Sequence, residues 1–383
     1  MKQMELYVHI PFCVQKCLYC DFLSGPASYE VKSLYMHRLS EEIQALAPEY
    51  DNYEVSTVYI GGGTPSSLEA VMIERLMEDL FQFFHIRGDA EITIECNPGT
   101  IYGGNARIMR RAGINRMSFG LQSVKDSELK LLGRIHTFED FLKSFEEARK
   151  AGFSNINIDL MYALPGQSVE DWKESLKKTV ILRPEHISAY SLMIEKGTPF
   201  YDRYHEDDLV REQGGDPVLL PSEEEEREMY LVARDYLEGH GYPCYEISNF
   251  AKPGYACRHN IGYWIGEEYL GLGLGASSLI GDVRFSNTSD MQEYLKQPFS
   301  RKNEELRDRK GKIGEYMFLG LRMTEGISRQ DFKDRFGTEP EAIYGNTLYD
   351  LMQEGLLEAL EGRIYLTSRG LDVSNQVFSR LLL

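Results

Sequence analysis

The segment Phe12-Cys13-Val14-Gln15-Lys16-Cys17-Leu18-Tyr19-Cys20 carries three cysteines at the spacing C-x3-C-x2-C and follows the apolar run Leu6–Ile10. Three thiolates on one short loop can hold three irons of a [4Fe–4S] cluster and leave the fourth iron without a protein ligand. The alternative is a structural zinc site completed by His9 or Cys257, although zinc ligands more often pair as C-x2-C. The spacing therefore favours an iron–sulfur cluster with one open iron, ligated by Cys13, Cys17 and Cys20.

The composition is that of an acidic globular protein. The 383 residues include 42 Lys and Arg against 60 Asp and Glu, which gives a formal net charge of −18. This charge repels phosphate backbones and anionic membrane surfaces, so we expect no nucleic-acid partner. Six cysteines, half of them in one loop, do not form a disulfide framework. We find no room for a signal peptide and no apolar run that could span a membrane, and we expect a cytoplasmic protein.

Short apolar segments alternate with helical ones between residues 6 and 191. We expect strands at Leu6–Ile10, Val55–Ile60, Glu91–Glu95, Arg116–Gly120, Asn155–Leu160 and His186–Ser191. We expect helices between them at Tyr29–Leu46, Leu68–Phe84, Ala106–Ala112, Phe138–Ala151 and Val169–Leu182. Strand–helix units in series predict a parallel sheet with right-handed crossovers. The pattern alone does not decide between a doubly wound sheet and a partial TIM-like barrel.

Glycines and polar side chains follow the expected strands. The second strand leads into Gly61–Pro65, with the sequence GGGTP, where glycines let the backbone approach a ligand, although a tight turn would look the same. Glu95, Gln122 and Asp159 follow the next three strands, and Arg134 offers a guanidinium suited to a carboxylate. Because the carboxyl ends of parallel strands meet at one rim, we expect these residues to form one site there.

A second candidate site lies beyond the connecting stretch 192–245. Within Cys257–Trp264, with the sequence CRHNIGYW, His259 can ligate heme iron while Tyr263 and Trp264 offer flat walls. A buried histidine beside a packed tryptophan would explain the same residues without any ligand. The glycine-rich stretch Gly271–Ala276 is interpreted as a loop that closes over the cofactor site.

The tail, residues 312–383, has a winged-helix-like pattern. We expect helices at Gly314–Met323, Arg329–Phe336 and Ala342–Glu354, followed by a two-stranded wing within residues 355–367. The helix that would enter a DNA groove, Glu341–Glu354, carries acidic residues and no Lys or Arg. Phosphates would be repelled by it, so the pattern does not predict DNA binding.

The cysteine loop and its flank Tyr7-Val8-His9-Ile10-Pro11-Phe12-Cys13 resemble the radical S-adenosylmethionine (SAM) enzymes, in particular the oxygen-independent coproporphyrinogen III dehydrogenase-like branch. The resemblance implies a partial (β/α)6 TIM-like barrel with a connecting segment over residues 1–240. It also implies an α+β C-terminal domain over residues 241–383, with a winged-helix-like tail that covers the substrate side. That branch usually has glycine where Ala163 stands.

The same resemblance implies the cofactors. The open iron would chelate the methionyl amine and carboxylate of SAM, and electron transfer would cleave SAM to a 5′-deoxyadenosyl radical. The residues that it assigns to SAM are Tyr7, Tyr19, Gly62, Gly63, Thr64, Glu95, Gln122, Arg134 and Asp159. The motif His259-Asn260-x-x-Tyr263-Trp264 matches the HNxxYW signature of heme chaperones in this branch, which makes His259, Tyr263 and Trp264 the heme candidates.

Two functions compete within the branch. The dehydrogenases decarboxylate coproporphyrinogen III, carry a further cysteine two residues after the third where Phe22 stands here, and have an extension ahead of the barrel that is not expected here. These differences and the HNxxYW motif favour a heme chaperone with heme as cargo and heme-accepting proteins as partners. The alternative from a different class of function is a regulator that senses redox state through its cluster. The sequence leaves open whether SAM is cleaved, which would require an electron donor, and whether the chain forms a homodimer.

Overall fold

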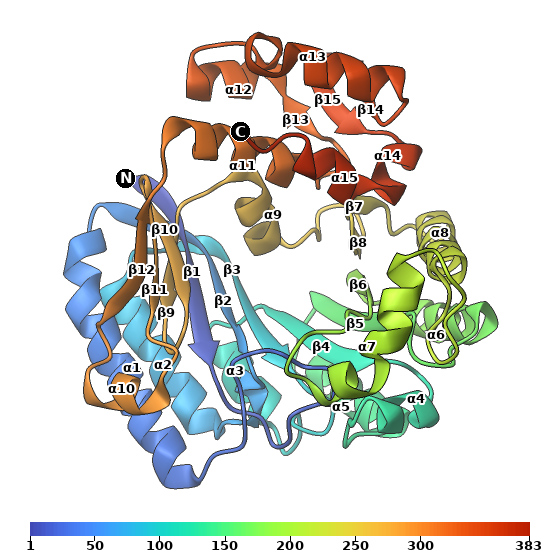
Figure 1. Cartoon of the computed structure of the whole chain (residues 1–383). Coiled ribbons are helices and arrows are strands. Elements are labelled where there is room, and N and C mark those ends of the chain that lie inside the picture. Colours follow the sequence, from blue (N-terminus) through green and yellow to red (C-terminus); the bar gives the residue numbers. More distant parts are fainter.

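The computed structural model describes residues 1–383 and is built around one large sheet (Figure 1). Its central strands run parallel in the order β1 to β6, as the alternating pattern predicts. Their bounds are β1 Lys2–Ile10, β2 Tyr53–Gly62, β3 Ile86–Cys96, β4 Arg116–Gln122, β5 Ile156–Tyr162 and β6 His186–Ser191. The predicted partial (β/α)6 barrel is confirmed.

Helices cover the outer face of these strands (Figure 1). They are α1 Tyr29–Leu46, α2 Ala70–Phe83, α3 Asn105–Arg111, α4 Asp126–Leu131, α5 Phe138–Lys150 and α6 Val169–Ile181, with single 3-10 turns at Ala47–Tyr50 and Pro65–Ser67. Thr137 with Asp140, and Ser168 with Asp171, form capping boxes that start α5 and α6. The pattern located five of these helices to within a few residues, because their caps and apolar faces are local features, and it did not predict the short helix α4.

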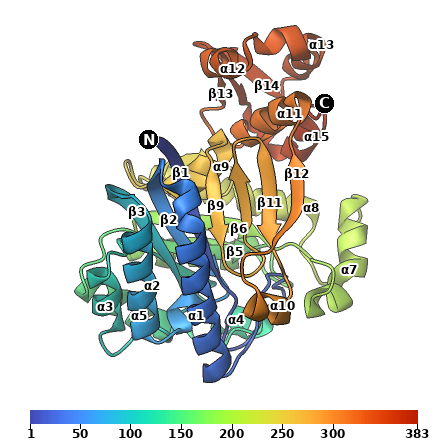
Figure 2. The same cartoon turned by 90° about the vertical axis from the view of Figure 1, so that its left-hand side faces the viewer.

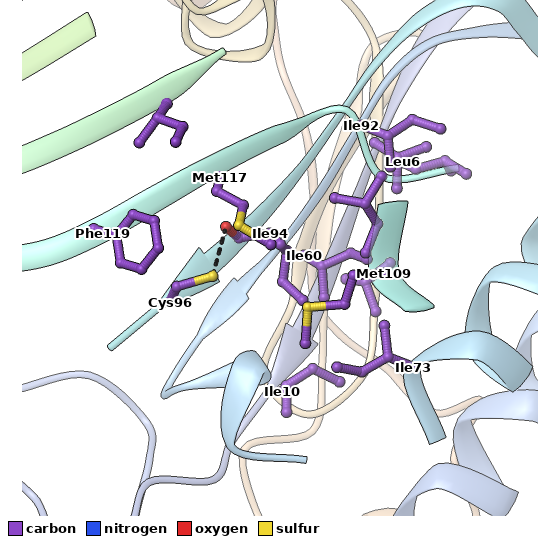
Figure 3. Packing of buried hydrophobic residues seen from close by; sticks show 14 of the residues in the cluster. Leu6, Ile10, Ile60, Ile73, Ile92, Ile94, Cys96, Met109, Met117 and Phe119 are labelled. Atoms are coloured by element: carbon purple, nitrogen blue, oxygen red, sulfur yellow. Dashed lines mark hydrogen bonds between the residues drawn. The ribbon is translucent and has the colours of Figure 1, made fainter. Parts of the chain in front are cut away.

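The hydrophobic core lies between the sheet and the outer helices (Figure 3). Ile60 and Ile94, from β2 and β3, pack there with Ile73 of α2 and Met109 of α3. Cys96 belongs to this core, where its thiol donates to the carbonyl oxygen of Ile94 at 3.7 Å. Cys96 also lines the cavity that holds the three clustered cysteines, and whether it is dispensable for the cluster stays a prediction.

The segment after β6 adds two helices and extends both ends of the sheet. The helices are α7 Pro199–Glu212 and α8 Glu223–Gly239, and α8 begins at a capping box formed by Ser222 and Glu225. The short strands β7 Cys244–Glu246 and β8 Asn249–Ala251 continue the sheet beyond β6. On the other side, β9 Tyr269–Leu272 lies parallel to β1, followed by β10 Ser277–Ile280, β11 Val283–Asn287 and β12 Arg301–Leu306. The helices α9 Arg258–Ile265 and α10 Met291–Lys296 lie in this region.

One expectation about the glycine-rich stretch is wrong. Gly271 and Leu272 are part of strand β9, and Gly271 pairs with Tyr7 of β1. A β-carbon on Gly271 would be 2.2 Å from the carbonyl oxygen of Ser277, so the glycine permits close packing of β9 and β10. Only Gly273 to Ala276 form a turn, which follows β9.

The last residues form a separate small unit with its own core (Figure 2). Its elements are α11 Arg309–Gly320, β13 Ile327–Ser328, α12 Arg329–Phe336, α13 Pro340–Gln353, β14 Leu357–Leu360, β15 Arg363–Leu366, α14 Ser368–Asp372 and α15 Ser374–Ser379. The predicted two-stranded wing is β14 and β15, and β13 joins it as a third strand. We call residues 309–383 the C-terminal unit. Whether the chain divides at residue 240 stays a prediction.

The C-terminal unit is the part expected to cover the substrate side, and that expectation stays a prediction. The unit lies over the amino-terminal ends of β1–β3, whereas the tips of these strands point away from it (Figure 1). Lys312 of α11 bonds Asp282 in the β10–β11 turn at 2.9 Å, and Arg227 of α8 bonds Asp372 at 2.7 Å. The unit therefore does not cover the strand-end site.

No helix has the length and apolar character that crossing a bilayer requires.

Candidate functional site

A cavity of about 130 Å³ lies at the carboxyl ends of the parallel strands, and we call it the cysteine cavity. The loop between β1 and α1 contributes Cys13, Cys17 and Cys20 to its wall. The predicted SAM residues that line the cavity are Tyr19, Gly62, Gly63, Thr64, Glu95, Gln122, Arg134 and Asp159. The structure thus brings every predicted residue of the strand-end site into one cavity except Tyr7.

Two of the thiols have polar partners inside this cavity. The Thr64 hydroxyl donates to the Cys13 sulfur at 3.6 Å, and Arg134 Nη1 donates to the Cys17 sulfur at 3.5 Å. The three thiols do not stand in a ready-made ligand triangle in the structure. Their common cavity and these donors are what support them as ligands, since donors that favour sulfur in its thiolate form suit iron binding.

The two glycines of the turn after β2 are required by close packing. Gly62 has a φ of +113°, and a β-carbon there would be 2.6 Å from the His9 ring. A β-carbon on Gly63 would be 2.7 Å from the carbonyl oxygen of Phe12, next to the first cysteine. The backbone of this turn therefore lies directly against the cysteine loop, as the glycine-rich sequence suggests.

Two half-buried carboxyl groups, those of Glu95 and Asp159, line the cavity. Glu95 accepts hydrogen bonds from the Gly62 amide at 2.9 Å and the Tyr59 hydroxyl at 3.0 Å. Burial, and secondly the charge of Asp159, raise the pKa of Glu95 to about 7. Burial also raises the pKa of Asp159, against hydrogen bonds from Asn157 at 2.7 Å and Ser118 at 3.2 Å. Both carboxyl groups suit a ligand that donates hydrogen bonds or carries positive charge.

The supporting residues were not predicted from the sequence. Asn97 donates to the Thr64 hydroxyl at 2.7 Å and accepts from Arg134 Nη2 at 3.0 Å, so it links two cavity residues. Tyr59 and Asn157 hold Glu95 and Asp159 in the same way. Asn97 directly follows Glu95-Cys96 at the end of β3, and its place at a strand end is the signal that could have found it.

A second and larger cavity, of about 650 Å³, lies along the inner face of the sheet, and we call it the large cavity. Tyr7 and His9 of β1 line it, together with Tyr263 and Trp264 of α9. Strands β9–β11 and the helices α11 and α12 of the C-terminal unit complete its wall. Tyr7, expected beside SAM, therefore lies in the large cavity, with its hydroxyl 3.0 Å from His9 Nδ1.

His259 does not line the large cavity. Its Nδ1 shares a hydrogen bond with the Thr57 hydroxyl at 2.7 Å, and its Nε2 shares one with the Tyr263 hydroxyl at 3.0 Å. Burial, and secondly the charge of Arg116, lower the pKa of His259 to about 3, so the ring is neutral. Tyr263 and Trp264 are the members of the motif that reach the cavity. The role of His259 as a heme ligand stays a prediction.

The structure thus joins a radical SAM-type barrel, with three cysteines at its strand ends, to a small C-terminal domain. The sequence matches the radical SAM superfamily over residues 7–179 and the HemN C-terminal domain over residues 308–373. Radical SAM proteins carry a [4Fe–4S] cluster and SAM, which confirms the cofactor class indicated by the cysteine spacing.

Full-length relatives narrow this class. The heme chaperone HemW of Lactococcus lactis is 38% identical, over 100% of this chain and 98% of that protein. HemW of Bacillus subtilis is 36% identical over 98% of both chains. The chain belongs to the family of heme chaperone HemW. The solved coproporphyrinogen III oxidase HemN of Escherichia coli shares its fold, with a TM-score of 0.85, 24% identity, and coverage of 100% of this chain and 90% of that one.

Proposed function

We propose that this protein is a heme chaperone that binds heme in the large cavity and passes it to acceptor proteins. The observation that carries the proposal is the cavity itself, whose volume of about 650 Å³ lies within the range of small-molecule sites. Tyr263 and Trp264 form an aromatic wall there, which suits a flat porphyrin. The relatives that match over their full length are heme chaperones, which supports the same conclusion.

The residues that line the cysteine cavity suit a [4Fe–4S] cluster with SAM. Cys13, Cys17 and Cys20 would hold the cluster, and the backbone of Gly62 and Gly63, which lies against the cysteine loop, would line the SAM pocket beside it. Cluster and SAM together supply one-electron chemistry when bound. In this chain Glu95 and Asp159 would accept hydrogen bonds from SAM, Tyr19, Thr64 and Gln122 would line its pocket, and Arg134 would stabilise the Cys17 thiolate.

The two cavities meet at His9. Its ring lines the large cavity, and its edge packs against Gly62, which lines the cysteine cavity. SAM or the cluster can therefore influence heme through this contact. We further propose a cytosolic location and, where SAM is cleaved, a reducing partner that donates electrons. A homodimer is compatible with this arrangement.

Coproporphyrinogen III dehydrogenation is the competing activity. The shared fold of the solved HemN supports it only at the level of architecture. Phe22, which stands where the dehydrogenases carry a further cysteine, lines the cysteine cavity with 62% of its surface exposed. Its apolar ring cannot replace a thiol as a proton donor or metal ligand. We therefore consider decarboxylation a weaker candidate function than heme delivery.

One parallel assay separates the two functions. Protein reconstituted anaerobically with iron, sulfide and SAM would be titrated with heme, mixed with an apo heme protein, and incubated with coproporphyrinogen III and a strong reductant. We expect heme binding and transfer without decarboxylation. Ser277→Trp, which places a large ring in the large cavity, should abolish binding, whereas Ser127→Trp on the exposed face of α4 should not. Decarboxylation without heme transfer would overturn the proposal.

A further inference from the structure

One end of the large cavity is strongly basic. Five cationic side chains line it, and we call them the basic group: Arg284, Arg307, Arg309, Lys312 and Arg335. They come from strand β11, the segment between β12 and α11, the start of α11 and the end of α12. The only acidic side chains of the lining are Glu267 and Glu315, which leaves a surplus of three positive charges. In a chain with a net charge of −18, this end of the cavity is suited to an anion.

The carboxylates nearby do not satisfy all of these cations. Glu315 accepts from Arg307 at 2.5 Å and also from Arg284, so two guanidinium groups share one carboxylate. Lys312 is paired with Asp282 at 2.9 Å. The remaining two arginines have no acidic partner.

The two arginines without an acidic partner are Arg309 and Arg335. Arg309 donates to the backbone carbonyl of Phe336, and Arg335 lies over the ring of Tyr316 at 5.0 Å. In addition, Arg307 Nε is buried without a hydrogen-bond partner. These groups retain donors for a further anionic ligand.

The rest of the cavity determines what kind of anion fits. Tyr7, Tyr263 and Trp264 form the aromatic wall, and Leu279 of β10 and Leu319 of α11 add apolar surface. A small inorganic anion would leave this surface exposed to water. The combination suits a flat apolar molecule whose negative charges lie on one edge, as the two propionates of heme do.

We propose that Arg309 and Arg335, supported by Arg307, form a carboxylate subsite that binds the propionate edge of the porphyrin. This inference rests on the proposed heme-chaperone function. Arginine is suited to this role because its planar guanidinium can bind a carboxylate through two parallel hydrogen bonds. Arg309 and Arg335 belong to the C-terminal unit, whereas Tyr7 and Leu279 belong to the sheet. A bound porphyrin would therefore connect the C-terminal unit to the barrel.

The test compares heme with its dimethyl ester, which keeps the ring and iron but has no ionised carboxylate. Both ligands would be titrated into the anaerobically reconstituted full chain, and into the double variants Arg309→Gln/Arg335→Gln and Arg203→Gln/Arg369→Gln. The second pair removes the same charge from exposed positions on α7 and α14, outside the cavity. Circular dichroism of each variant checks that it is folded.

We expect Arg309→Gln/Arg335→Gln to weaken heme binding by roughly tenfold or more, since hydrogen bonds to charged groups are among the stronger ones. Binding of the dimethyl ester should be unchanged in this variant, and the control pair should bind both ligands as the unmodified chain does. Heme binding that is equally strong in all three proteins would overturn the subsite while leaving the chaperone proposal intact. Equal weakening of heme and ester would also overturn it. A chain that binds neither ligand would overturn the proposed function itself.

Discussion

The imidazole of His9 lies against the backbone of Gly62, so close that a β-carbon on Gly62 would be 2.6 Å from ring atoms Cε1 and Nδ1. His9 lines the large cavity and Gly62 lines the cysteine cavity, so this pair forms the partition between the two sites. The His9 ring is held on its other side by the Leu23 carbonyl, 2.9 Å from Nε2. Leu23 follows the three cysteines, so the ring also touches the cysteine loop.

Gly62→Ala should therefore impair both sites together. The new methyl group would push the His9 ring away, and alanine is strained at a φ of +113°. We expect lower affinity for SAM and a changed spectrum of bound heme. Gly99→Ala is the matched control, because Gly99 also has a positive φ, +85°, but a β-carbon there meets nothing within 4 Å. A Gly62→Ala protein that keeps both affinities would contradict the role of this partition.

The cysteines provide a second prediction. Alanine at Cys13, Cys17 or Cys20 should abolish the cluster, whereas Cys257→Ala and Cys96→Ala should retain it. Cys257 is buried at the start of α9, where its thiol donates to Glu91 at 3.5 Å, away from the cysteine cavity. Bound iron and sulfide, measured after anaerobic reconstitution, test this. Loss of the cluster in Cys257→Ala would indicate that Cys257 is a fourth ligand and would contradict the assignment.

The strand-end site was predictable because its signals are local. Apolar runs located β1–β6, and residues such as Glu95 and Asp159 directly follow buried strand segments, so topology alone brings them to one rim. Ala163, where the resembling branch has glycine, has a φ of +58°, which explains why glycine suits that position.

The large cavity could not be predicted in this way. Arg284, Arg309 and Arg335 lie on three elements that no sequence pattern brings together. Strand β12, Arg301–Leu306, is exposed at every residue and is a strand only because it pairs with β11. The burial of His259 likewise depends on where α9 packs against the barrel.

The HNxxYW motif is the subject of a third prediction. Both ring nitrogens of His259 are hydrogen bonded below the cavity wall, whereas Tyr263 lines the cavity. We expect Tyr263→Phe to shift the Soret band of bound heme, because a tyrosine oxygen can ligate heme iron. His259→Ala should mainly lower stability, by about 1–3 kcal/mol, because Thr57 and Tyr263 lose a buried partner. A Soret band that is lost in His259→Ala but unchanged in Tyr263→Phe would show that the histidine is the ligand.

The last prediction concerns Glu42, a buried carboxyl of α1 that supports the turn beside His9. It accepts hydrogen bonds from the Gly273 amide at 3.0 Å, Asn287 Nδ2 at 2.6 Å and the Tyr294 hydroxyl at 2.6 Å. Gly273 is itself so close to the His9 carbonyl oxygen that a β-carbon would be 2.6 Å from it. Glu42 therefore connects α1 to the turn that fixes the backbone of His9.

Burial raises the pKa of Glu42 from 4.5 to about 7, although its hydrogen bonds oppose the shift. The folded chain therefore binds more protons at this site than the unfolded chain between these two values. The free energy of unfolding should fall as the pH rises through this window, by about 3 kcal/mol from this group, and level off above pH 7. The contribution is fully present only below pH 4.5; at pH 5 about three quarters of it remains, and at pH 8 it is lost.

Glu42→Gln should remove this part of the pH dependence, because the amide is neutral at both pH values. At pH 5 the variant should be less stable than the unmodified chain by about 1–2 kcal/mol, since its nitrogen cannot accept the hydrogen bond from Asn287, whereas at pH 8 it should be the more stable of the two by about 1 kcal/mol. Anaerobic urea unfolding at pH 5 and pH 8 measures both effects. Glu206→Gln, at an exposed position of α7, is the control that should keep the pH dependence of the unmodified chain. An equally steep fall in Glu42→Gln would show that another buried group causes it.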